Sequence, residues 1–170
     1  MRPAVLLALM CLALAAGGCA GYKLGPTNGL RAGEKSIQIN PIINSTLEPR
    51  LGEELSHAVR KKIQHDGTYR LDTGGTGDVI VSVDITKYHR SYLALQRRDT
   101  LTARDYELIL TAMVVATDRA TGREILHREV RGKTTALVGS DLVSLERQAR
   151  PLLTENLAQN ITDLLVDGEW

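Results

Sequence analysis

Three arginines stand close together in an irregular stretch of the sequence and form its clearest chemical cluster. Arg90, Arg97 and Arg98 lie within the segment from Arg90 to Asp99, which lacks the alternation of polar and apolar residues found on either side. A guanidinium group keeps its positive charge and presents five hydrogen-bond donors, so such a cluster could bind an anion. We therefore expect a working surface, if the protein has one, at this segment.

One cysteine has a sequence context that predicts a covalent modification. Arg2 and the apolar run of residues 5–16 are typical of an export signal, and the run is shorter than the roughly 20 residues that span a bilayer. Two glycines directly precede Cys19, as in a bacterial lipobox, so we expect cleavage before Cys19 and acylation of its thiol. Cys11 would be removed with the signal, which leaves Cys19 without a disulfide partner. The alternative is an ordinary secretory signal with an incidental cysteine.

The residues that follow the cysteine predict a location and a domain organisation. Ala20 stands where an aspartate would favour retention at the inner membrane, so a lipid-anchored position on the periplasmic side of the outer membrane is expected. We divide the chain into a lipoprotein signal peptide at 1–18, a lipidated tether rich in Gly, Pro and Asn at 19–35, and a single domain at 36–170.

The remaining residues predict neither an enzyme nor a metal or cofactor site. The four histidines are scattered, and His57 and His65 lie two helical turns apart, too far for ordinary paired ligation of a metal. No zinc-protease, serine-hydrolase or Walker sequence occurs. The glycine loop at 74–77 precedes a strand instead of opening a helix, which argues against a nucleotide site.

Composition excludes a general nucleic-acid binder. The chain has 21 basic and 20 acidic residues, and loss of Arg2 with the signal makes the two numbers equal. Nucleic-acid-binding domains are expected to be clearly basic, so any attraction to anions must come from a local patch. Phenylalanine is absent, and the core must consist mainly of Leu, Ile and Val.

Alternation of apolar and polar residues predicts the strands. It is strongest in a hairpin from Val79 to Asp118, whose two long strands flank the irregular arginine segment. A short first strand is expected at Ser36–Asn40, where Pro41 should stop the ladder. A polar strand at Arg123–Lys133 suits a sheet edge, although its cations could also form a ligand surface.

Helical spacing predicts two helices. Apolar residues recur every fourth position from Leu51 to Ile63, after possible caps at Asn44–Thr46, and the helix should end near Gly67. Its basic trio at 60–62 is either a solvated helix end or an anion site. The second helix should begin after residues 139–141 and reach nearly to the C-terminus, and Pro151 should kink it or divide it into two.

The predicted order of elements behind a lipidated cysteine resembles the LptE family of outer-membrane lipoproteins. The segments that carry the resemblance are Cys19–Leu24, Ile37–Pro49, Asp78–Val81 with Ile85 and Tyr88, and Asp105–Leu108. The family fold is α+β, with two helices on one face of a four-stranded mixed sheet in the order β-α-β-β-β-α. That order agrees with the elements expected from the periodicity of this chain.

The resemblance implies a function. LptE proteins bind the β-barrel LptD as a plug, assist its assembly and contact lipopolysaccharide during its insertion into the outer leaflet. It implies that Arg97, Arg98 and Arg90 near the hairpin tip meet lipopolysaccharide, with Lys133 as a possible additional anion contact. Guanidinium groups match phosphate oxygens with paired hydrogen bonds, which fits a phosphorylated lipid. An adaptor or pilotin of another envelope machine, such as a secretin or barrel-assembly complex, is the alternative, and a periplasmic hydrolase is a third.

Overall fold

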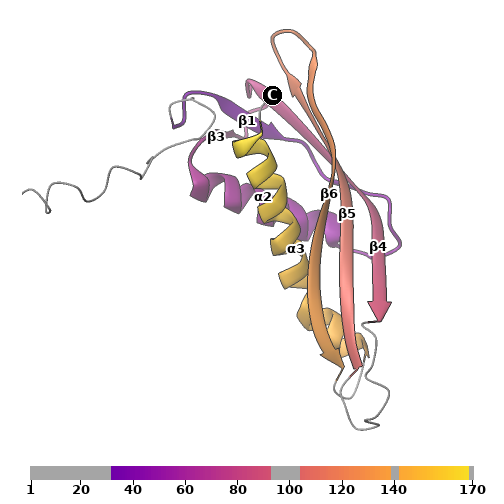
Figure 1. Cartoon of the computed structure of the whole chain (residues 1–170). Coiled ribbons are helices and arrows are strands. Elements are labelled where there is room, and N and C mark those ends of the chain that lie inside the picture. The colour runs from indigo at the N-terminus through magenta and orange to yellow at the C-terminus, as the bar shows by residue number, and fades with distance from the viewer. Residues whose placement is uncertain (1–31, 93–103, 139–141, 169–170) are drawn as a thin grey trace, which may run out of the picture.

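The computed structural model describes residues 32–92, 104–138 and 142–168, which form one mixed sheet with two helices against one face (Figure 1). The α+β class with two helices and a mixed sheet is therefore confirmed. In chain order the elements are β1 (Ser36–Ile39), β2 (Ile43–Asn44), α2 (Leu51–Asp66), β3 (Arg70–Asp72), β4 (Val79–Tyr92), β5 (Arg104–Asp118), β6 (Glu124–Val138) and α3 (Leu142–Asp167).

The sheet has more strands than the four expected from the sequence. Its order is β3-β1-β4-β5-β6, and β2 also pairs with β4, so the expected number is wrong. The strands β1, β2 and β3 pair in parallel with their neighbours, whereas β4, β5 and β6 form an antiparallel meander. The strands that were not counted have only two and three residues, which is too short for alternation to show in a sequence.

Pro41 interrupts the ladder along β4 but does not end it. Asn40 donates its backbone N–H to Val81 O at 2.9 Å, and beyond the proline Ser45 donates to Ile85 O at 3.0 Å. The chain therefore follows the same edge of β4 before and after the break, first as β1 and then as β2. A proline lacks the N–H that a ladder needs, so the ladder is lost only locally.

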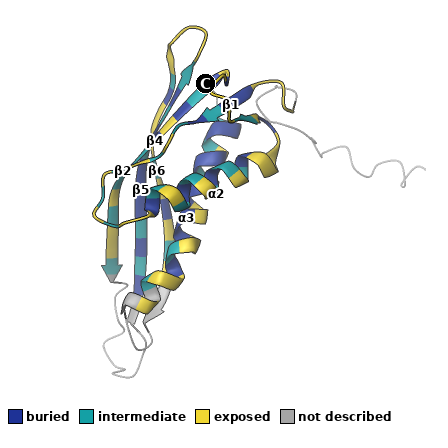
Figure 2. Cartoon of the chain, turned by 180° about the vertical axis from the view of Figure 1, so that it is seen from behind, coloured by how far each residue is buried: buried dark blue, intermediate teal, exposed yellow. Residues whose placement is uncertain are grey.

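The core lies between the helices and the sheet face that they cover. Both helices turn an apolar stripe to this face, and Figure 2 shows the resulting bands of burial along helices and strands. The expected stripe of α2 is confirmed at Leu51, Leu55, Val59 and Ile63. The sheet contributes mainly Val79, Val81, Val83 and Ile85 from β4, and Leu108, Leu110, Ala112 and Val114 from β5.

Helix α2 ends as expected but begins differently. Gly67 has a positive φ of 77° and donates its N–H to Ile63 O, a common way to finish a helix. The N-cap is Arg50, with a φ of 70° and no side-chain cap, so the predicted caps at Asn44–Thr46 are wrong. Asn44 is used in the preceding loop instead, where its carbonyl oxygen accepts hydrogen bonds from Thr46 and its amide donates to Glu48 O.

Helix α3 is continuous through Pro151, so of the two alternatives, a kink or a division, the division into two helices does not occur. The proline leaves the carbonyl one turn earlier without its usual helical donor. Thr154 donates its hydroxyl to Arg150 O and Pro151 O at 3.1 and 3.0 Å, which adds hydrogen bonds in the turn that follows. The polar edge strand is confirmed as β6, which is longer than expected and pairs only with β5.

Candidate functional site

An irregularity in β4 decides which way its last residues face. Ile85 pairs with Ala112, but Tyr88, three residues later, pairs with Leu110, only two residues earlier on β5. One extra residue in β4 therefore forms a bulge, which reverses the faces of the residues beyond it. Tyr88 and Arg90 consequently turn to the helix-covered face. The expectation that the irregular segment begins at Arg90 is wrong, because β4 continues to Tyr92.

Arg90 lies in a cluster of charges contributed by four elements or loops. Its Nη2 donates to Glu48 Oε1 at 2.8 Å and to Glu146 Oε2 at 3.3 Å, while its Nε lies against the other oxygen of Glu146. Its guanidinium carbon also lies 5.2 Å from the centre of the Tyr88 ring. Arg150 of α3 continues the cluster, 3.7 Å from Glu48 and 4.0 Å from Glu54.

These contacts link the end of β4 to the loop before α2 and to both helices. Burial opposes the charge of Arg90, but the bond with Tyr88 and the nearby Glu146 and Glu48 carboxylates raise its pKa overall. Burial also raises the pKa of the Tyr88 phenol. The geometry gives Arg90 a structural role through these carboxylates, and its contact with lipopolysaccharide stays a prediction. Arg97, Arg98 and Cys19 lie outside the described residues.

Lys133 lies on the sheet face that the helices leave uncovered. Its Nζ is 3.8 Å from Glu107 Oε1. The strand register places His89, Ile109 and Lys133 in one row across the sheet, and Lys87, Thr111 and Arg131 in the adjacent row. Four basic side chains thus flank β5, two from each neighbouring strand. Periodicity alone missed this grouping, because the bulge in β4 hides the register.

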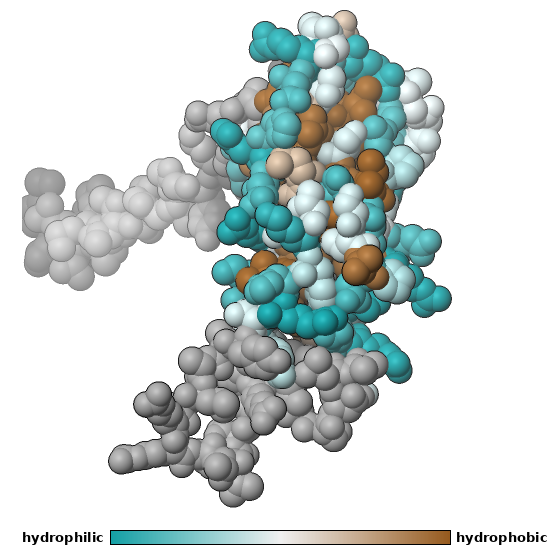
Figure 3. Space-filling model, turned by 90° about the vertical axis from the view of Figure 1, so that its right-hand side faces the viewer, coloured by the Kyte–Doolittle hydropathy of each residue, from teal (hydrophilic) through white to brown (hydrophobic). Residues whose placement is uncertain are grey.

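Between the polar residues of β4 and β6, β5 turns apolar side chains to the uncovered face. Ile109, Met113 and Val115 are each half-buried there. Figure 3 shows hydrophobic side chains along the middle of this side of the molecule, among hydrophilic ones. An antiparallel sheet can present one face to water, and an apolar strip with a polar rim is a common form of protein-binding surface.

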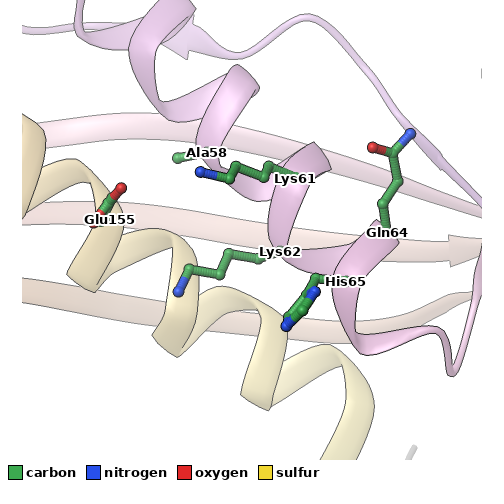
Figure 4. A pocket seen from close by; sticks show the side chains of 6 residues that line it. All are labelled: Ala58, Lys61, Lys62, Gln64, His65 and Glu155. Carbon is green, nitrogen blue, oxygen red and sulfur yellow. The ribbon is translucent and has the colours of Figure 1, made fainter.

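A hollow with basic side chains lies elsewhere, between α2 and α3. It measures about 440 Å³ and is lined by Lys61, Lys62 and His65 from α2 and Glu155 from α3, among others (Figure 4). Arg60, the first of the basic trio, does not line it. Its Nη2 donates to Ile39 O at 2.7 Å, which fastens α2 to β1.

The described residues offer neither a metal site nor a membrane-spanning helix. No group of three or more histidine, cysteine or acidic side chains there could hold a metal ion. None of the helices at 51–66 and 142–167 combines the length and apolar character needed to cross a membrane.

The family model of LptE, described as lipopolysaccharide-assembly, matches residues 34–167. The chain belongs to the LptE family. The family resemblance seen in the sequence is therefore confirmed, and the chain is a member of a lipopolysaccharide-assembly family. No curated protein matches the sequence.

Solved structures show that this LptE-family fold recurs in distant proteins. A hypothetical protein CT253 from Chlamydia trachomatis has a TM-score of 0.56 and 11% identity, over 77% of this chain and 95% of that one. A minor lipoprotein from Acinetobacter baumannii has a TM-score of 0.53 and 16% identity, over 78% and 92%. Lipoprotein B from Nitrosomonas europaea has a TM-score of 0.52 and 14% identity, over 86% and 90%. At these identities the likeness concerns the fold.

Proposed function

We propose that this LptE-family chain is a non-enzymatic outer-membrane lipoprotein that binds an LptD-type β-barrel as a plug. In this role it assists assembly of the barrel and contacts lipopolysaccharide during its insertion into the outer leaflet. The family match carries the proposal, because it spans nearly the whole described domain, residues 34–167. Acylation at Cys19 anchors the chain to the periplasmic side of the outer membrane.

The uncovered sheet face supports the proposed partner. The interior of a membrane β-barrel is polar, so a domain that enters it needs a largely polar surface. The apolar strip of Ile109, Met113 and Val115 lies between rows of charged and polar residues on β4 and β6. The strip provides apolar contact area against a barrel wall, and the charged rows suit the surrounding polar lumen.

Basic side chains of the chain support the proposed ligand. Arg97 and Arg98 belong to the connection between β4 and β5. On the uncovered face, Lys133 shares a row with His89. Lipopolysaccharide carries phosphate groups, which arginine binds with two parallel hydrogen bonds and lysine binds as a point charge.

The partner is tested by purification of the tagged protein from native outer membranes, followed by mass spectrometry. An LptD-type barrel should be recovered in near-equal amount, and depletion of the protein should remove lipopolysaccharide from the cell surface. Recovery of a secretin or a barrel-assembly complex without LptD, or normal surface lipopolysaccharide after depletion, would contradict the proposal. Radiolabelled palmitate should enter the wild-type protein and not a Cys19→Ala variant.

The ligand site is tested by reversal of the two tip charges. Arg97→Asp with Arg98→Asp should weaken binding of lipopolysaccharide by at least about tenfold, if each charge contributes ~1 kcal/mol or more. Arg123→Asp with Arg128→Asp is a matched control that reverses the same number of charges. Arg123 directly precedes β6 and Arg128 lies in β6, and both side chains are exposed. Equal binding by the wild type and the tip variant would remove the site from the proposal.

A further inference from the structure

We propose that the C-terminal end of α2 contacts the membrane surface, with Lys61 and Lys62 facing anionic phospholipid headgroups. The inference rests on the proposed acylation of Cys19 and concerns how the anchored domain is oriented. The proposed partner is a bilayer. The proposed contact site is distinct from the arginine segment at 90–99 and from the uncovered sheet face. Three observations carry it.

The first observation is the place where the chain enters the domain. Gly33 donates its backbone N–H to Thr68 O at 2.9 Å, and Arg70 donates to Lys35 O at 3.0 Å. The entering chain is therefore fixed beside the residues that directly follow α2. Thirteen residues separate this entry from Cys19, and even a fully extended chain of that length spans only about 45 Å. An acyl chain on Cys19 consequently keeps this end of the domain within about 45 Å of the bilayer.

The second observation is the charge at this end. Lys61 and His65 are exposed and Lys62 is half-buried, and all three line the hollow between the helices. Figure 4 shows the two lysine side chains extending into the space between α2 and α3. Lys35 and Arg70, on the entering chain and β3, are also exposed. Basic residues next to a lipid anchor are a recurrent means of binding anionic membranes.

The third observation is that these two lysines have no ion-pair partner within the described residues. The salt bridges found there involve other cations, including Arg90, Arg131 and Arg150. Glu155 lines the same hollow but pairs with neither lysine. Lys35 and Arg70 differ, because both help to lower the pKa of Asp78 and are therefore partly neutralised. At this end of the domain, Lys61 and Lys62 are therefore available to a headgroup.

The alternative use of these lysines is local to the helix. Cations in the last turns of a helix interact favourably with its dipole, and this effect needs no ligand. The two interpretations differ in one measurable respect. A lysine that serves only the helix dipole stays equally accessible to solvent whatever the lipid composition, whereas a lysine at a bilayer surface becomes shielded when the surface is anionic.

The test is lysine footprinting of the acylated protein in vesicles. The purified protein is reconstituted in phosphatidylcholine alone or with one third phosphatidylglycerol, and acetylation of each lysine is followed by mass spectrometry. Acetylation of Lys61 and Lys62 should be about fivefold slower in the anionic vesicles, the factor expected for a lysine at such a surface. High salt should remove the difference. Lys87 and Lys133 on the uncovered sheet face are the control, and their rates should not change.

Each other outcome overturns the inference. Equal acetylation rates for Lys61 and Lys62 in both kinds of vesicle would show that these lysines do not face the headgroups. If acetylation of Lys87 and Lys133 slowed by the same factor, the anionic surface would shield all lysines alike and the contact would not be specific to α2. The same protection by inorganic phosphate without vesicles would identify a site for a free anion. Protein that does not float with the vesicles and carries no acyl mass on Cys19 would refute the anchoring itself. This result is distinguishable, because in every other outcome measured with vesicles the protein floats.

Discussion

Gly132 of β6 packs directly against the backbone and Cβ of Leu157 in α3. A Cβ placed on Gly132 would lie 2.6 Å from Leu157 Cβ and 2.7 Å from its backbone nitrogen, closer than real carbon atoms approach. The helix can therefore lie against the strand only because this position lacks a side chain. Neighbouring hydrogen bonds depend on the same approach, since Lys133 donates its N–H to Asn156 and Asn160 donates to Arg131 O.

We expect Gly132→Ala to destabilise the protein by about 2 kcal/mol, because the added methyl group must push α3 away from β6. Urea unfolding followed by circular dichroism measures the change. Gly74→Ala is the matched control, since the new Cβ would meet only the Asp72 carboxylate at 3.6 Å, an ordinary contact. Equal stability of the two variants would show that α3 and β6 can accommodate a methyl group at Gly132 without separating.

The cluster around Arg90 leads to a second prediction. Arg90→Met leaves Glu146, whose side chain is only 15% exposed, without its principal cation. A loss of about 1–2 kcal/mol is expected, smaller than for a fully buried pair because Arg90 itself is 41% exposed. Arg131→Met is the control, because its pair with Glu129 lies on an exposed part of one strand, and we expect little change there. Thermal unfolding distinguishes the two.

Much of this arrangement follows from the sequence, and the exceptions have physical causes. The stripe from Leu51 to Ile63 and the glycine after it predict α2 correctly, because both signals are local. The face of Arg90 could not be predicted, since a single bulge residue reverses it and leaves only a weak trace, the spacing of three between Ile85 and Tyr88. The grouping of Lys133 with His89 likewise depends on register across three strands.

The pKa of Asp78 leads to a prediction about acid stability. The Ser36 hydroxyl donates to this carboxylate at 2.6 Å and the Ser36 N–H at 2.8 Å, and these bonds hold the pKa of Asp78 below its ordinary value. A group with a lowered folded-state pKa contributes stability above its unfolded pKa and loses that contribution as the pH falls through the folded value.

Ser36→Ala should therefore lower stability at neutral pH and make its decline below about pH 4 less steep. Urea unfolding at several pH values between neutral and strongly acidic measures the slope. Ser82→Ala is the control, because its hydroxyl contacts the neutral amide of Asn40 and should shift stability equally at every pH. Parallel curves for Ser36→Ala and the wild type would contradict the assignment.

Arg50 leads to a prediction of increased stability. It has a φ of 70° at the start of α2, a conformation that costs a residue with a Cβ roughly 1 kcal/mol relative to glycine. Arg50→Gly should therefore raise the melting temperature by about 2–4 °C in a domain of this size. Arg50→Ala keeps the Cβ and should give no such gain. An equal effect of alanine and glycine would show that the side chain, and not the backbone, limits stability.

The contact between α3 and β6 has a consequence for biogenesis. The outer edge of β6 is hydrogen-bonded to Asn156 and Asn160. Both residues belong to α3, the element that follows β6 in the chain. Synthesis proceeds from the N-terminus, so the three-stranded meander can form before the helix that covers its edge has been made. In that interval an open strand edge is available for wrong pairing. Protection by chaperones would thus be needed most before residues 142–167 have been made.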